Sequence, residues 1–147
     1  MVYEILSLIL VLALFMSHTY QYFKDKKRED HEWWLSECRD CIKSVESKFQ
    51  SRCEEITEEA FKHFKEMIPH VRDYELKQRM LNDKISEYIS KISDLKKEYI
   101  ATLYIKLQEQ PYRVHITTVP EHLVQEYERN ISKTANTFIE FIRLMYQ

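Results

Sequence analysis

The sequence contains no glycine among its 147 residues, and this absence excludes several classes of functional site. Phosphate-binding loops, dinucleotide-binding fingerprints and nucleophile elbows need a residue that tolerates positive φ or a close backbone approach. Proline is also scarce, occurring only at Pro69, Pro111 and Pro120. We therefore expect an all-α chain of long helices, and we expect neither an enzyme nor a cofactor nor a small-molecule substrate.

A surplus of positive charge is missing as well. The chain has 22 basic and 24 acidic residues mixed along its length, and its isoelectric point is near 6.3. Proteins that bind nucleic acid usually carry a basic face or stripe, and none is apparent here. Nucleic acid is therefore not an expected partner.

Charge is nearly absent from the first 23 residues, where Glu4 and His18 are the only ionisable side chains that are not tyrosines. A helix from Val2 to Tyr22 would span about 30 Å, which matches the thickness of a bilayer core. Aromatic residues flank the run at both ends, as in an interfacial belt. A cleaved signal peptide and a buried core helix are alternatives, but no basic start or small-x-small cleavage site is evident. Residues 1–23 are predicted to be a transmembrane anchor.

A charged juxtamembrane linker is predicted over residues 24–30, which include Lys24, Lys26, Lys27 and Arg28. Under the positive-inside rule, this cluster would keep the remainder of the chain in the cytoplasm.

Two long amphipathic helices are predicted over residues 31–110, with a break near Pro69. Apolar residues recur at steps of three and four from Leu35 to Met67, and again from Tyr74 to Leu107. Between Leu81 and Tyr99 the spacing is heptad-like, which favours a coiled coil. Pro69 can either kink or end a helix, so two arrangements remain open. The helices form an antiparallel bundle, or they form an extended rod paired with a second copy as a homodimer.

The next segment, residues 111–120, differs because β-branched and polar residues alternate between two prolines, which predicts a short extended stretch. Beyond Pro120, a third apolar stripe through Tyr127, Ile131 and Phe138 predicts a C-terminal helix over residues 121–147.

Three cysteines, Cys38, Cys41 and Cys53, occur in the first amphipathic stripe. On one straight helix Cys41 and Cys53 lie about 18 Å apart, too far to share one metal ion, so no metal site is predicted. Cys38 and Cys53 suit small apolar positions on the stripe. In an oxidising compartment any of the three cysteines could form an intermolecular disulfide across a parallel dimer.

The order of these parts resembles the inner-membrane spanins of phage lysis cassettes, the Rz-like proteins. The matching pieces are the anchor, the helical stretch, the segment Arg113-Val114-His115-Ile116-Thr117-Thr118-Val119, and the helix from Glu121 through Tyr127 to Tyr146. The resemblance implies a non-enzymatic role in the last step of host lysis, in which a rod held in the host inner membrane crosses the periplasm and binds an outer-membrane lipoprotein. The partner-binding residues are then expected to be Arg113, Val114, His115, Ile116, Val119, Tyr127, Ile131 and Phe138.

A second hypothesis keeps the anchor but reverses its orientation. The chain would then be a cytoplasmic helical bundle that acts as an adaptor, immunity or regulatory protein.

Overall fold

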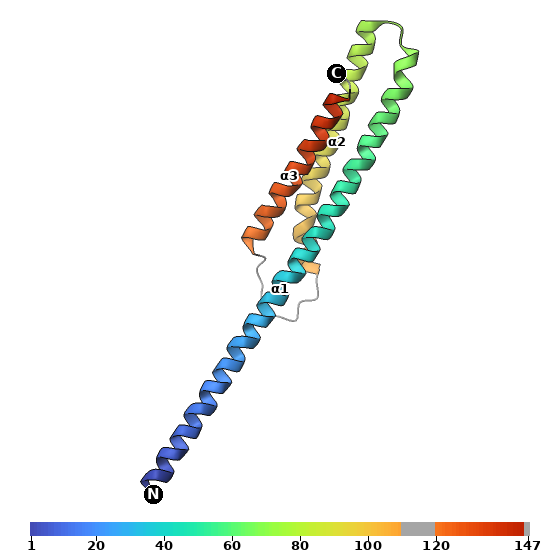
Figure 1. Cartoon of the computed structure of the whole chain (residues 1–147). Helices are drawn as coiled ribbons and strands as arrows, with labels where there is room; N and C mark the ends of the chain where they lie inside the picture. Colours follow the sequence, from blue (N-terminus) through green and yellow to red (C-terminus); the bar gives the residue numbers. More distant parts are fainter. Residues whose placement is uncertain (110–119, 146–147) are drawn as a thin grey trace. The chain divides into compact units, whose positions relative to one another are not determined.

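The computed structural model describes residues 1–109 and 120–145. Nearly all of these residues are helical, and none of them lies in a strand. The helices are α1 (Val2–Met67), the short 3-10 helix η1 (Ile68–His70), α2 (Tyr74–Glu109) and α3 (Glu121–Leu144) (Figure 1). The described residues fall into two compact units, one made of residues 1–37 and the other of residues 38–109 and 120–145.

Helix α1 extends over 66 residues because nothing in this part of the sequence stops it. It contains neither glycine nor proline, the two residues least favourable inside a helix. Residues 24–30, predicted as a linker between anchor and helix, are themselves helical. A charged stretch does not end a helix when each side chain can remain in water.

A hairpin at Pro69 separates α1 from α2. Pro69 occupies the first turn of η1, and Val71 then takes an extended conformation with φ −104° and ψ 111°. Asp73 caps the next helix, because its carboxylate oxygen accepts hydrogen bonds from the backbone N–H groups of Glu75 at 2.9 Å and Leu76 at 3.3 Å. Such a cap satisfies donors that have no partner within the helix. Of the two arrangements that the sequence left open at Pro69, the described residues adopt the hairpin.

The second unit is an antiparallel bundle of three helical segments. Residue numbers fall along α1 as they rise along α2, since His63 and Phe64 lie against Tyr88 while Phe49 lies against Tyr99. Helix α3 returns beside α2, and the two pack more closely than other pairs of helices (Figure 1). The hydroxyl of Tyr127 in α3 donates a hydrogen bond of 2.7 Å to the backbone oxygen of Tyr99.

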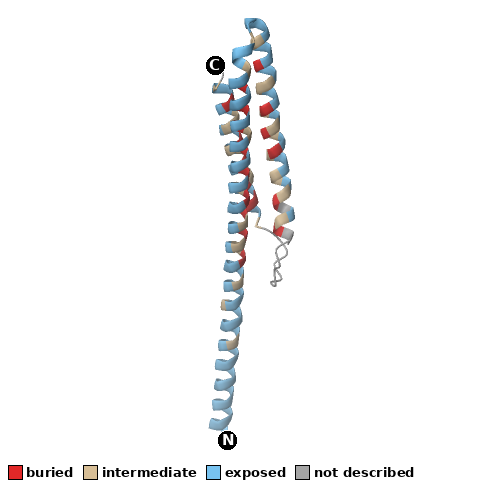
Figure 2. Ribbon diagram, turned by 90° about the vertical axis from the view of Figure 1, so that its right-hand side faces the viewer, coloured by how far each residue is buried: buried red, intermediate tan, exposed pale blue. Residues whose placement is uncertain are grey.

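Buried residues lie along the facing sides of these helices (Figure 2). Most belong to the predicted stripes: in α1 they are Cys38, Ile42, Val45, Phe49, Cys53, Ala60 and Phe64, in α2 Leu81, Tyr88, Ile92, Leu95, Leu103 and Leu107, and in α3 Leu123, Val124, Tyr127, Ile131, Ala135 and Ile142. Thr57 is a buried polar residue, and its hydroxyl donates to the backbone oxygen of Cys53 at 2.8 Å. Tyr74, which was expected to extend the α2 stripe, is instead exposed in the first turn of that helix.

Candidate functional site: an exposed apolar helix and a helical bundle

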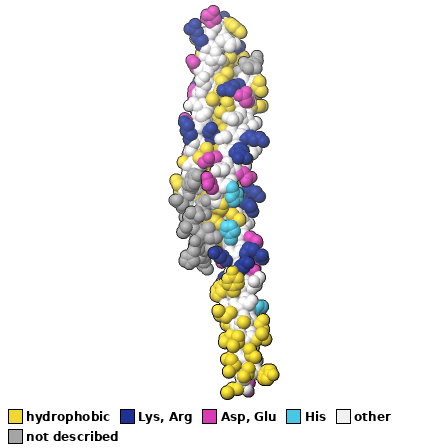
Figure 3. Space-filling model, turned by 90° about the vertical axis from the view of Figure 1, so that its left-hand side faces the viewer, with side chains coloured by type: hydrophobic (Ala, Val, Ile, Leu, Met, Phe, Trp, Pro, Cys, Tyr) yellow, Lys and Arg dark blue, Asp and Glu magenta, His cyan; other side chains and the backbone are white. Residues whose placement is uncertain are grey.

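The most unusual surface of the first unit is its N-terminal apolar segment, which we define as residues 2–23. The large apolar side chains from Ile5 to Met16 are each 54–70% exposed, so no side of the helix is covered. In Figure 3 they cover the visible face of this segment. None of its most apolar stretch is buried, and the helix is long and apolar enough to cross a membrane. Exposed apolar surface on this scale marks a site that contacts lipid or protein.

Basic residues follow the apolar segment directly, and Figure 3 shows Lys and Arg side chains gathered there. Lys24, Lys27 and Arg28 are exposed on one side of the helix. Arg28 lies 3.9 Å from Glu32, and both side chains in this ion pair are largely exposed. Water screens such a pair, so it contributes little to stability.

The residues predicted to bind a partner lie in three different settings. Arg113, Val114, His115, Ile116 and Val119 fall outside the described residues, as does nearly all of the predicted extended segment 111–120. Tyr127 and Ile131 are buried in the bundle, and Phe138 is half-buried. Within the described bundle, Tyr127 and Ile131 therefore contact the chain's own helices.

The Tyr127 side chain links α3 to α2 through its hydrogen bond, and its phenol is poorly suited to act as a general acid or base. Burial raises the pKa of its phenol, and the neighbouring carboxylate of Glu46 raises it further. A phenol with a raised pKa remains neutral and acts as a hydrogen-bond donor at neutral pH.

The three cysteines differ in accessibility. Cys38 and Cys53 are fully buried and Cys41 is half-buried. Burial raises the pKa of the Cys53 thiol to about 12, and the adjacent Glu54 carboxylate adds to the rise. Burial also raises the pKa of Cys41, although Lys106 and Lys48 oppose the effect. The thiolate is the reactive form of cysteine, and a raised pKa disfavours it. Neither Cys41 nor Cys53 is therefore activated as a nucleophile. The described residues include no group of three or more side chains placed to hold a metal ion.

A polar cluster around Tyr88 joins α1 to α2. The buried Tyr88 hydroxyl is hydrogen-bonded to Nδ1 of His63 and donates to Oε1 of Glu59 across 3.5 Å. The Lys91 ammonium lies 4.6 Å from the centre of the Tyr88 ring and 3.5 Å from Glu59. Burial raises the pKa of Tyr88 to about 12, and the carboxylates of Glu59 and Glu87 contribute. The cluster fixes how the two helices meet.

The sequence pattern does not predict this cluster around Tyr88. Its members are separated by at least 25 positions between helices, so they meet only because the chain turns at Pro69. The sequence offered one indirect signal: Tyr88, a polar aromatic residue, occupies a position on the predicted stripe.

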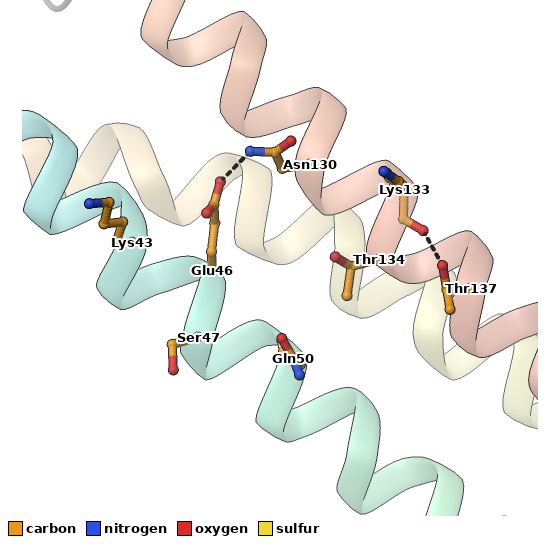
Figure 4. Close-up of a pocket in the computed structure, with 8 residues that line it drawn as sticks. All are labelled: Lys43, Glu46, Ser47, Gln50, Asn130, Lys133, Thr134 and Thr137. Carbon is orange, nitrogen blue, oxygen red and sulfur yellow. Dashed lines mark hydrogen bonds between the residues drawn. The ribbon is translucent and has the colours of Figure 1, made fainter.

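An open polar groove of about 500 Å³ separates α1 from α3 (Figure 4). Its lining is hydrophilic, and the residues are Lys43, Glu46, Ser47 and Gln50 of α1 with Asn130, Lys133, Thr134 and Thr137 of α3. The Asn130 amide donates a hydrogen bond of 3.1 Å to Glu46, bridging the two helices. Ligand pockets are typically enclosed and mostly apolar, whereas this groove is a water-accessible seam between packed helices.

No protein-family model matches the chain, and comparisons with curated proteins and with solved structures find no significant match.

Proposed function

We propose that the protein is a non-enzymatic, single-pass membrane protein that holds a helical bundle at a membrane surface. The observation that carries this proposal is the exposed apolar segment in a chain whose bundle has a core of its own. The apolar side chains of residues 2–23 are exposed on every side of the helix, whereas the stripes of residues 38–109 and 120–145 are buried against one another. Transfer of exposed apolar surface from water to hydrocarbon releases roughly 25 cal/mol per Å², which makes a bilayer the favourable environment for this segment.

The proposed orientation places the bundle in the cytoplasm, where it acts as an adaptor, immunity or regulatory protein. Lys24, Lys26, Lys27 and Arg28 directly follow the apolar segment, and the positive-inside rule retains such a flank on the cytoplasmic side. The hairpin at Pro69 supports a compact bundle over a rod. Residues 38–67 and 74–109 run alongside each other, so their lengths do not add along one axis.

A spanin-like lysis protein is the second candidate, favoured by the order of the parts. An apolar N-terminal segment, long helices and a C-terminal helix after Pro120 follow one another as the resemblance implies. In this candidate the bundle lies in the periplasm of the host, and the partner is an outer-membrane lipoprotein bound by Arg113 to Val119 and the exposed face of α3. A homodimer linked through Cys41 would also suit this candidate.

Membrane extraction tests the anchor. Full-length protein should remain with the membrane fraction after an alkaline carbonate wash. Replacing Leu10 and Leu12 by Arg costs about 6–8 kcal/mol of insertion free energy and should release the protein. The matched variant, with Ala at both positions, should remain bound. Equal retention of the Arg and Ala variants in the membrane fraction would contradict the proposed anchor.

Protease accessibility separates the two orientations. On inverted membrane vesicles a cytoplasmic bundle is digested, whereas a periplasmic one is protected until detergent is added. Protection would reject the adaptor proposal and leave the spanin-like candidate in place.

A further inference from the structure

Four of the five basic or histidine residues that directly follow the apolar segment lie on one face of α1, whereas Lys26 lies on the opposite side. Lys24 is three residues before Lys27 and four before Arg28, and these spacings make side chains neighbours on a helix surface. His31 continues the same face, being four residues after Lys27 and three after Arg28. All four side chains are exposed. We call Lys24, Lys27, Arg28 and His31 the basic face.

Of the four acidic residues in this region, three lie off the basic face, and Asp30, three residues after Lys27, borders it. Asp25, Glu29 and Glu32 are separated by four and three residues, so they follow a second line along the helix. Arg28 lies at the border of the two lines, where it approaches Glu32 at 3.9 Å. Among the described residues no ion pair involves Lys24 or Lys27. Both ammonium groups therefore remain available to an external anion.

Three members of the basic face, Lys24, Lys27 and Arg28, match the depth of lipid phosphates, whereas His31 lies beyond it. Headgroup regions add about 5–8 Å to each side of the hydrocarbon core. From Phe23, the last aromatic residue of the apolar segment, Arg28 is about 7.5 Å along the helix axis and His31 about 12 Å. Lysine and arginine side chains are long enough to reach along the helix toward the interface.

The geometry points to a binding site for anionic phospholipid headgroups on the basic face, formed by Lys24, Lys27 and Arg28. This inference rests on the proposed membrane anchor, because the anchor brings the basic face to headgroup depth. The ligand chemistry is a phosphodiester monoanion whose headgroup carries no compensating cation, presented by the lipid next to the helix. One Lys or Arg near an anionic surface favours association about fivefold, so we expect at least that preference for an anionic over a zwitterionic lipid.

Electron spin resonance with spin-labelled lipids tests the site. Full-length protein is reconstituted into phosphatidylcholine vesicles that contain a trace of spin-labelled phosphatidylglycerol or, separately, spin-labelled phosphatidylcholine. The fraction of motionally restricted label reports association with the protein. We expect association of phosphatidylglycerol to be at least about fivefold stronger at low salt, and weaker in 0.5 M chloride because salt shortens the screening length.

Two charge-matched variants locate the effect. Lys24→Gln, Lys27→Gln and Arg28→Gln combined should abolish the preference, whereas Lys62→Gln, Lys65→Gln and Arg72→Gln, exposed residues near the hairpin, should leave it intact. Equal preference in both triple variants would overturn the inference. So would displacement of phosphatidylglycerol by inorganic phosphate beyond that caused by chloride of equal ionic strength, since a free anion would then be the ligand.

Failure of the anchor gives a different result from failure of the site. Protein that does not remain with the vesicles after a carbonate wash contradicts the proposed function. Protein that remains but associates equally with both labelled lipids contradicts the headgroup site alone.

Discussion

Replacing Phe49 by alanine should destabilise the bundle more than any substitution at its surface. The Phe49 side chain is completely buried, and its ring centre lies 5.3 Å from that of Tyr99 at an interplanar angle of 59°. Truncating a buried phenylalanine costs about 3–5 kcal/mol, which includes the cavity left behind. The lost aromatic pair accounts for roughly 0.5–1.5 kcal/mol beyond area burial. We expect a total of about 4 kcal/mol.

This loss is large relative to the stability of a small domain, which is about 5–15 kcal/mol. For a bundle of about 100 residues, each kcal/mol lowers Tm by roughly 4–8 °C, so Phe49→Ala should lower it by about 15–30 °C. Urea titration of full-length protein in detergent micelles, followed by circular dichroism at 222 nm, measures the change in the free energy of unfolding. A thermal scan with the same signal measures the change in Tm. We expect the apolar segment to remain helical in the micelle and to contribute a constant baseline.

The matched control is Phe61→Ala in the same helix. Phe61 is 54% exposed, so its truncation should change the free energy of unfolding by no more than about 0.5 kcal/mol. A double-mutant cycle between Phe49 and Tyr99 should show coupling of about 1 kcal/mol, since the two rings meet only if the chain folds back. Equal effects of Phe49→Ala and Phe61→Ala, or additive effects in the cycle, would refute the hairpin.

Three further measurements probe the bundle. Tyr127→Phe should lower the free energy of unfolding by about 1 kcal/mol in the same titration, because the 2.7 Å hydrogen bond to the Tyr99 carbonyl is lost; an unchanged midpoint would contradict it. The pKa of Tyr88 is raised from 10.0 to about 12, so its stabilising contribution is complete below pH 10 and is lost as pH rises toward 12. Stability should fall over that range, and a Tyr88→Phe variant that falls equally steeply would exclude this cause. Under native conditions a maleimide should label Cys41 before the other two cysteines, and mass spectrometry that finds faster labelling at buried Cys53 would contradict the packing.

The sequence predicted which side chains form the core better than it predicted their partners. From Cys38 to Phe64 and from Leu81 to Leu107, positions on the predicted stripes are largely buried. A periodic apolar stripe indicates that one face of a helix is buried, but it does not indicate whether the surface that covers this face belongs to the same chain. Tyr127 and Ile131 illustrate this limit: the stripe is compatible with a partner's surface, and in the described residues both side chains are buried within the chain's own bundle.

The periodicity of apolar residues likewise could not predict whether the chain reverses direction at Pro69. Proline is compatible with a kink and with a helix end, and the stripe continues on both sides of it. The fold-back is stabilised by pairs such as Phe64 and Tyr88, whose contact depends on tertiary structure. The apolar segment could be predicted because composition alone determines its hydropathy, and the exposure of its side chains agrees with that prediction.

The position of α2 between its neighbours in sequence has a consequence for how the chain acquires its structure. The hydrogen bonds that join α2 to α1 and to α3 connect residues 25 to 32 positions apart. The contact between Asn130 and Glu46, which joins the two outer helices, spans 84 positions and lies at a wet seam. Closing a long loop costs more entropy than closing a short one. Each helix can therefore dock as it leaves the ribosome, with α2 packing onto α1 first and α3 packing onto α2 second. The contact between α1 and α3 forms last.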